Sequence, residues 1–74
     1  MIDFEEALVY LKNRKKVFRE GWNGKGQFVC MQVPDENSKM KEKYLYLKNC
    51  SENLVPWVPS QDDLFASDWR VLND

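Results

Sequence analysis

The 74-residue chain contains no histidine, and this absence excludes the commonest catalytic designs. Histidine is the usual general base near neutral pH, and it activates the nucleophile in Ser–His and Cys–His pairs. Carboxylates remain as alternatives, because Asp62, Asp63 and Asp68 lie close together in the sequence. Acidic residues at the start of a helix, however, are usually capping residues. The sequence therefore predicts a protein that is not an enzyme.

Cysteine is nearly as scarce, with only Cys30 and Cys50, which allow one disulfide at most and no four-ligand zinc site. Cys30 lies within an apolar strand pattern, which favours a small core residue over a nucleophile. The run Gly24-Lys25-Gly26 lacks the strand-to-helix context of a phosphate-binding or dinucleotide-binding fingerprint. We therefore expect neither a metal nor a cofactor.

Long apolar runs and a signal peptide are also missing, so we expect a cytosolic protein with reduced thiols and no membrane partner. Eleven basic and twelve acidic residues give a net charge of −1. A nucleic-acid duplex would meet no overall attraction, and no nucleic-acid partner is expected. Basic residues do cluster at 14–19 and 39–43, but such clusters are typical of solvated turns.

Aromatic residues, by contrast, are abundant. Three tryptophans, three tyrosines and four phenylalanines exceed what one small core requires, and flat aromatic surface suits stacking and interfaces. A core of this size supplies only a few kcal/mol of net stability. With disulfides and metals unexpected, oligomerisation is the predicted source of further stability.

The local patterns predict one α+β domain over residues 1–74, with an N-terminal helix, a small, mainly antiparallel sheet and a short second helix near the C-terminus. The first helix is expected over Ile2–Lys12, capped by Asp3 and ended by a left-handed Asn13. The second is expected to begin at Ser60 with Asp63 completing a capping box, and Leu64 and Phe65 are expected to face inward. Strands are expected at 17–22, 27–33, 44–47, 54–58 and 69–72, the fourth of these at an edge because of its prolines.

The turn between the first two strands is open to two interpretations. Asn23-Gly24 is a strong signal for a type I′ hairpin turn, which needs no ligand to explain it. Gly26 follows closely, and a second glycine suits close approach of a ligand to the backbone. Trp22 and Lys25 flank the same turn and offer a stacking face and a phosphate-seeking charge. Near the C-terminus, Trp69 is predicted to be a core or oligomer-interface residue. For Trp57, a structural role of this kind and a role in a ligand site are about equally favoured.

Two separated segments resemble a known phage and prophage family. The first is FEEALVYLKNRKKVFREGWNGKGQF, in which a short amphipathic helix leads through a basic turn into an R-x-G-W-N-G-K-G segment. The second is LVPWVPSQDDLFASDW, from Leu54 to Trp69. The resemblance covers nearly the whole chain, with both motifs in the family's order. By this resemblance the chain is identified as a member of the type 2 Thoeris anti-defence family.

The resemblance implies a non-catalytic protein that binds the cyclic ADP-ribose signal of host defence enzymes in the host cytoplasm and holds it without cleaving it. It also implies a homotetramer with nucleotide pockets between subunits. Trp22 would stack on the base and Phe4 would supply a second apolar wall. The turn residues 23–25 would lie near ribose and phosphates, and polar side chains of the second segment would hydrogen-bond hydroxyls or an amino group. The implied ligand-binding residues are Phe4, Trp22, Asn23, Gly24, Lys25, Gln61, Asp63 and Asp68.

The chain departs from the family pattern at Gln27, where an apolar residue is expected, and at Asp62, which replaces a threonine. The segment 34–43 is also shorter and more charged. These departures leave the identity of the ligand open, and cyclic dinucleotides are an alternative. A function of another class is inhibition of a defence nuclease by direct contact, through Lys39, Lys41 and Lys43 or through the edge at Trp57. A nucleotide hydrolase is the least favoured alternative.

Overall fold

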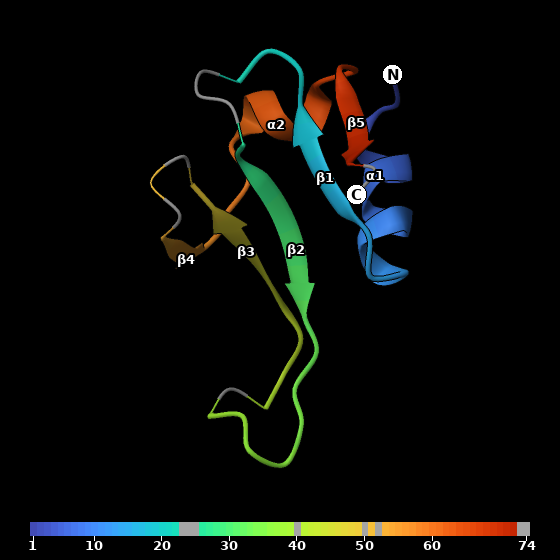
Figure 1. The fold of residues 1–74 in the computed structure, drawn as a ribbon. Helices are drawn as coiled ribbons and strands as arrows, with labels where there is room; N and C mark the ends of the chain where they lie inside the picture. Colours follow the sequence, from blue (N-terminus) through green and yellow to red (C-terminus); the bar gives the residue numbers. More distant parts are fainter. Residues whose placement is uncertain (23–25, 40, 50, 52, 73–74) are drawn as a thin grey trace.

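The structure is a computed structural model, and it describes residues 1–22, 26–39, 41–49, 51 and 53–72 (Figure 1). Within these residues, two helices and five strands form an α+β fold with the predicted order of elements. The predicted fold class is therefore confirmed. The elements are α1 (Phe4–Lys12), β1 (Lys16–Arg19), β2 (Phe28–Gln32), β3 (Tyr44–Lys48), β4 (Leu54–Pro56), α2 (Gln61–Phe65) and β5 (Trp69–Leu72).

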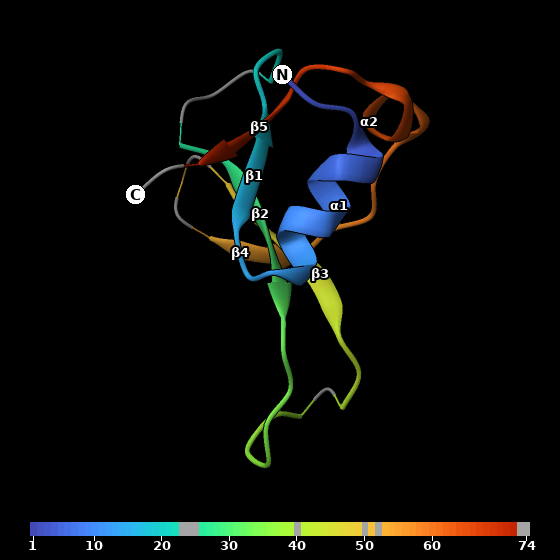
Figure 2. The same ribbon diagram turned by 90° about the vertical axis from the view of Figure 1, so that its right-hand side faces the viewer.

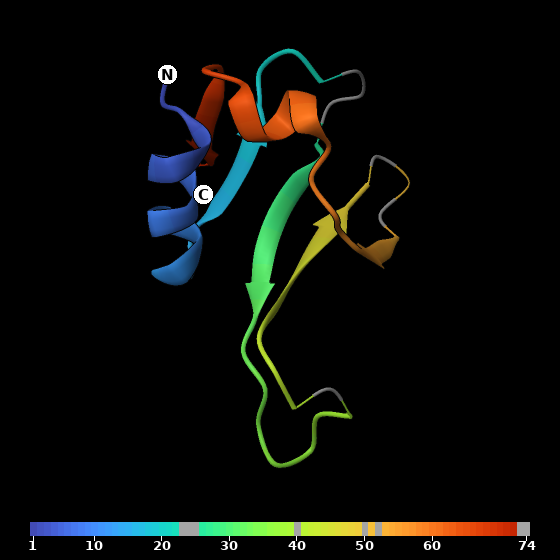
Figure 3. The ribbon, with the colours of Figure 1, turned by 180° about the vertical axis from the view of Figure 1, so that it is seen from behind.

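The five strands form one antiparallel sheet in the order β4-β3-β2-β1-β5. The helix α1 packs across one face of this sheet, and α2 lies on the same side, against α1 at the end of the sheet (Figures 2 and 3). The last strand lies beside the first, and Ile2 exchanges backbone hydrogen bonds of 2.9 and 3.0 Å with Trp69. The two ends of the described chain are thereby joined at one edge of the sheet.

The core lies between α1 and the sheet. Ala7 and Leu11 of α1 are fully buried, as are Val17, Val29 and Trp69 of the strands. Val17 pairs with Val29 on one side and with Val71 on the other, so these side chains share one face. Alternation along a strand directs the intervening residues to the opposite face.

We call this opposite face, which neither helix covers, the open face. It carries a half-buried row of aromatic, polar and basic side chains. Phe28 lies near the ammonium groups of Lys16 and Lys48, whose Nζ atoms are 5.0 and 5.4 Å from the ring centroid. Cys30 pairs with Tyr46 in the same row and is only half-buried. The prediction that Cys30 is a core residue is therefore wrong, because the core-facing position of β2 belongs to its neighbour Val29.

The predicted first helix is nearly correct. Asp3 caps it by accepting a 3.0 Å hydrogen bond from the amide of Glu6. Its predicted left-handed end is displaced by one residue. Asn13 has a φ of −95° and uses its side chain to donate to the carbonyl of Val9, while Arg14 has a φ of +65°. The turn thus falls on Arg14, an uncommon residue for positive φ.

The prediction of a tight two-residue hairpin between the first two strands is wrong for the strand residues on either side of the turn. An uninterrupted two-residue turn at 23–24 would pair Val17 with Cys30, whereas Val17 pairs with Val29. The strand β1 ends at Arg19, because Gly21 and Trp22 leave the sheet to contact the C-terminal segment. The turn residues 23–25 themselves lie outside the described residues. Gly26 has a φ of +85°, so a backbone requirement accounts for this glycine.

The predicted capping box of α2 is confirmed. The predicted inward orientation of its apolar residues is wrong. Ser60 and Asp63 exchange hydrogen bonds of 3.0 and 3.1 Å. Asp63 is the buried residue of this short helix. Residues one and two positions later point about 100° and 200° away around a helix. Leu64 and Phe65 therefore turn outward, with exposed fractions of 37% and 83%.

Three further predictions about the strands are confirmed. The short strand β4 lies at an edge of the sheet, and Trp69 is fully buried. Tyr44 and Tyr46 share one face of β3. Asn49 organises the turn after β3 by accepting from the amides of Ser51 and Asn53. Neither described helix has the length and apolarity required to cross a membrane.

Candidate functional site

Four aromatic rings, each from a different element or loop, form the centre of the candidate site, and we call them the aromatic cluster. Trp69 is the buried member, with Phe4 and Trp22 at 5.3 and 5.4 Å between ring centroids. Trp57 lies 6.0 Å from Trp69 and 6.4 Å from Trp22. The tilted and edge-on arrangements are those that aromatic pairs favour. Phe4, Trp22 and Trp57 are half-buried and thus form the outer part of the cluster.

A guanidinium group joins the two acidic residues that flank this cluster. Arg19 donates from Nε to Oδ1 of Asp68 over 2.8 Å and from Nη1 to Oδ1 of Asp63 over 3.0 Å. These contacts connect β1 to residues 44 and 49 positions later in the chain. All three side chains are mostly shielded from solvent, with exposed fractions between 12% and 27%. We call these three residues the Arg19 clamp.

The clamp also fixes the segment that follows β1. The amide of Gly21 donates to Oδ2 of Asp68 over 2.9 Å. The indole Nε1 of Trp22 donates to Oδ1 of Asp63 over a longer distance of 3.4 Å. On the other side, the indole Nε1 of Trp69 donates to the backbone carbonyl of Asp63 over 3.0 Å. One acidic residue thus contacts two of the four rings.

The clamp carboxylates are stabilised in their ionised form. Burial by itself raises the pKa of Asp63, but hydrogen bonds from Ser60, Arg19 and Trp22 outweigh it, so that the pKa is lowered. The guanidinium of Arg19 is the main cause that lowers the pKa of Asp68, with a further contribution from the amide of Gly21. Both carboxylates accordingly stay negative at neutral pH and act as hydrogen-bond acceptors.

The structure brings four of the eight predicted site residues together. Phe4 and Trp22 are in the aromatic cluster, and Asp63 and Asp68 are in the Arg19 clamp. Gln61 is exposed in the first turn of α2. The predicted residues Asn23, Gly24 and Lys25 lie outside the described residues. Within the described ranges, no group of three or more Cys, Asp or Glu side chains is arranged to hold a metal ion.

Three residues that support the site were not among those predicted. Arg19 and Gly21 stand just before Trp22 in the R-x-G-W segment, so the sequence did carry a signal for them. For Trp57 the sequence left a structural role and a ligand-site role equally open, and the structure places it half-buried in the aromatic cluster. Only the fold shows that Arg19 and Gly21 both contact Asp68 and that Trp57 lies against the rings of Trp22 and Trp69.

Gly21→Ala is expected to lower the free energy of unfolding by about 1–3 kcal/mol, because a Cβ atom there has no space. It would lie 2.9 Å from Oδ2 of Asp68, which Arg19 and the Gly21 amide hold in place. Urea unfolding measures the effect. In a double-mutant cycle, Asp68→Ala should remove most of the penalty. Equal penalties with and without the Asp68 carboxylate would contradict this steric account.

Comparison with known proteins assigns this arrangement to a family. The sequence profile of the Thoeris anti-defense 2-like domain matches residues 2–72, nearly the full length of the chain. The fold and the two-segment site therefore define a small α+β protein that belongs to the Thoeris anti-defense 2-like family.

The family assignment is supported by a curated relative. The protein is similar to the one named Thoeris anti-defense 2 of Bacillus phage SP01, with 31% identity over 85 residues. The match covers 97% of this chain and 96% of the relative. The similarity thus extends over both the N-terminal and the C-terminal segments that build the aromatic cluster.

Proposed function

We propose that this protein is a phage anti-defence protein that blocks host Thoeris immunity by binding and sequestering a cyclic ADP-ribose-type signalling nucleotide. Two facts support the anti-Thoeris role: the family that matches residues 2–72 and the name of the phage relative. The observation that carries the sequestering mechanism is the clamped, half-buried ring of Trp22 at the outer part of an aromatic cluster.

The geometry suits tight binding because the stacking surface is held in place before a ligand arrives. The ring of Trp22 packs edge-on against Trp57 and Trp69, and its indole N–H contacts Asp63. A ring that is already ordered loses little conformational freedom on binding, so more of the stacking energy appears as affinity. The backbone of Gly21 is fixed by Asp68 at the start of the adjoining turn.

A role without catalysis agrees with the chemistry of the clamp. Asp63 and Asp68 are hydrogen-bonded to Arg19, and their lowered pKa values make them weak bases at neutral pH. A sequestering protein needs no base, since binding removes free signal by mass action once protein exceeds ligand and the Kd is low. Such a protein would act in the host cytoplasm, where the signal is produced.

We also propose that the protein works as a homo-oligomer, a tetramer in the arrangement implied by the family resemblance. Two exposed apolar side chains within the second segment, Leu54 to Trp69, favour this assembly. Val58 and Phe65 have exposed fractions of 87% and 83% on either side of the α2 cap. Large exposed apolar side chains near a candidate site are typical of a surface that a partner covers.

Thermal unfolding with a series of ligands tests the proposal. Cyclic ADP-ribose isomers and cyclic dinucleotides should be added at protein concentrations that preserve an oligomer. A ligand present at 100 times its Kd adds about 2.7 kcal/mol of stability, which gives a clear rise in Tm. We expect this rise with one cyclic ADP-ribose isomer, and intact ligand on release after denaturation. A shift with cyclic dinucleotides alone would change the identity of the signal, and release of a cleaved product would contradict sequestration.

Trp22→Ala is expected to weaken binding of that ligand by roughly tenfold to a hundredfold, because one stacking face is lost. Isothermal titration calorimetry measures the Kd of the folded variant. Tyr10→Ala is the matched control: Tyr10 is a partly exposed aromatic residue of α1 that makes no ring contact with the cluster in the described interactions. Unchanged affinity in folded Trp22→Ala would remove Trp22 from the site.

Direct inhibition of a defence nuclease is the second candidate function, favoured by one observation. Lys39, Lys41 and Lys43 are all exposed in the connection between β2 and β3, where they are accessible to a macromolecular partner. Such an inhibitor would gain no thermal stability from any nucleotide signal. Loss of nuclease inhibition on replacing these lysines, together with an unshifted Tm in the ligand series, would favour this function over sequestration.

A further inference from the structure

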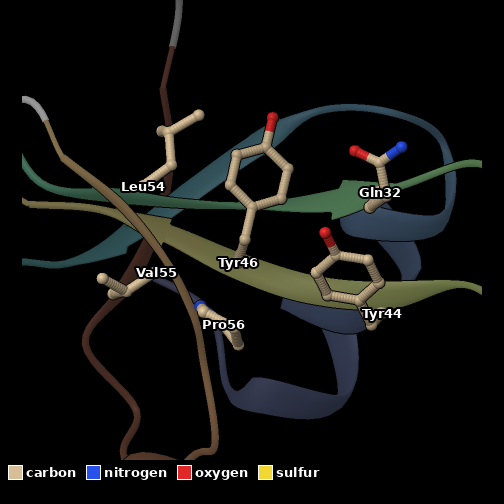
Figure 4. Close-up of a pocket in the computed structure, with 6 residues that line it drawn as sticks. All are labelled: Gln32, Tyr44, Tyr46, Leu54, Val55 and Pro56. Carbon is tan, nitrogen blue, oxygen red and sulfur yellow. The ribbon is translucent and has the colours of Figure 1, made fainter. Parts of the chain in front are cut away.

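Three adjoining hollows lie on the side of the sheet away from the candidate site, and together we call them the basic strip. The first, of about 140 Å³, is lined by Gln32, Tyr44, Tyr46, Leu54, Val55 and Pro56 (Figure 4). The second, of about 310 Å³, shares Gln32 and Tyr46 with the first. The third, of about 340 Å³, shares Gln32 and Tyr44 with it. Shared borders make the three hollows one continuous strip.

The charge of the strip is of one sign. Arg14, Lys15 and Lys16 line the second hollow, and Lys39 lines the third. None of the described residues that line the three hollows is acidic. The first turns of α1 and α2 carry acidic side chains on the helix-covered side of the sheet. The net charge of −1 therefore does not describe this strip, whose charged lining residues are all basic.

Flat rings stand between the two basic ends. Tyr44 and Tyr46 project from the same face of β3, and the carboxamide of Gln32 lies beside Tyr44 (Figure 4). Burial raises the pKa of Tyr46, so its phenol is uncharged at neutral pH and does not repel an anion. Half-buried rings at the middle of a basic groove are the features with which proteins hold unpaired bases between phosphate contacts.

We infer that the basic strip binds a linear single-stranded nucleic acid, with bases against Tyr44 and Tyr46 and phosphates at Arg14, Lys15, Lys16 and Lys39. All three hollows meet at Gln32, with one basic end in the second hollow and the other in the third. A strand with several phosphates can therefore reach both basic ends, whereas a ligand confined to one hollow reaches only one of them. A duplex fits poorly, because its bases are already stacked on one another and are not free to stack on the tyrosines. This binding goes beyond the proposed function and uses a surface separate from the aromatic cluster.

Fluorescence polarisation with a labelled 12-nucleotide oligo(dT) tests the inference. Few cations are involved and the whole protein is slightly acidic, so the expected Kd is about 10–100 µM at low salt. Four phosphate contacts to a single strand give a slope of log Kobs against log salt of about −3. An unlabelled 12-base-pair duplex should compete at least about tenfold less well, since it offers no unpaired bases to the tyrosines.

Two double variants, each of which removes two positive charges, test where on the protein the oligonucleotide binds. The double variant Arg14→Gly, Lys15→Ala removes two cations of the strip, and glycine accepts the positive φ at position 14. It should make the slope of log Kobs against log salt shallower by about 1.4. The control, Lys41→Ala with Lys43→Ala, removes two exposed cations that do not line the strip and should leave the slope unchanged. Tyr44→Ala should weaken binding roughly tenfold.

Several results would overturn the inference. These are no polarisation change at low salt, equal losses in the two double variants, equal competition by the duplex, and binding of a cyclic dinucleotide in the absence of oligonucleotide binding. Trp22→Ala serves to separate this inference from the proposed function. It should leave oligonucleotide binding unchanged while it weakens binding of the signalling nucleotide, and a parallel loss of both would show that the strip is not a separate surface.

Discussion

Trp69→Ala is expected to lower the free energy of unfolding by about 3–5 kcal/mol, enough to leave much of this small protein unfolded at room temperature. The indole is fully buried and touches the other three rings of the aromatic cluster. Its replacement opens a cavity at the point where the N-terminal and C-terminal segments meet. Its Nε1 hydrogen bond to the carbonyl of Asp63 is lost as well, which leaves a buried acceptor without its partner.

Near-ultraviolet circular dichroism and urea unfolding measure this effect. Phe65→Ala is the matched control, because Phe65 is also a large aromatic residue of the C-terminal segment but is 83% exposed. That substitution should change the free energy of unfolding by less than about 0.5 kcal/mol in the monomer. Trp69→Phe, which keeps a ring but not the N–H group, should show an intermediate loss. A Trp69→Ala protein with the wild-type urea midpoint would contradict the central role of this residue.

Arg19→Met is expected to lower the free energy of unfolding by about 2–4 kcal/mol, because it leaves two shielded carboxylates without their counter-charge. Breaking a fully buried ion pair costs about 3–5 kcal/mol. The loss expected here is smaller, because the clamp side chains retain exposed fractions of 12–27%. Arg70→Met is the control. It breaks the pair between Arg70 and Glu20, whose side chains are 48% and 51% exposed, and should cost less than about 1 kcal/mol.

The clamp also determines how stability depends on acid. The folded protein lowers the pKa values of Asp63 and Asp68, so the unfolded state binds protons first as the pH falls. Their contribution is complete above the unfolded carboxylate pKa of about 4 and is lost as the pH falls through the lower, folded values. Urea midpoints at pH 7, 5, 4 and 3 should therefore fall most steeply below pH 4, and less steeply in Arg19→Met. Identical acid profiles in both proteins would contradict the assignment of the shifts to Arg19.

Much of the fold follows from patterns within a few residues. The cap at Asp3, the capping box of Ser60 and Asp63, and the alternation of β3 each depend on neighbours close in sequence, and all were predictable. The same local argument failed for Leu64 and Phe65. Their orientation depends on Asp63, which is held inward by a guanidinium 44 positions earlier in the chain.

The candidate site was likewise predictable in part from local sequence and in part only from contacts between distant segments. The sequence offered Phe4, Trp22, Asp63 and Asp68, but it gave no reason to place Arg19 between the two acids. That placement requires β5 to lie beside β1 and α2 to cross the end of the sheet. A contact between segments so far apart has no local signature, because any of several arginines and lysines satisfies the charge pattern.

The sequence by itself determined the elements, their order, and the absence of histidine chemistry, because these depend on composition and on short-range periodicity. Only the tertiary structure decided which side of the sheet stays open and where charges of each sign gather. The antiparallel register sends Val17 and Val29 toward α1 and leaves Tyr44 and Tyr46 on the other side, since alternate side chains of a strand face opposite ways. A net charge near zero thereby coexists with a strip whose charged lining residues are all basic, which no sum over residues reveals.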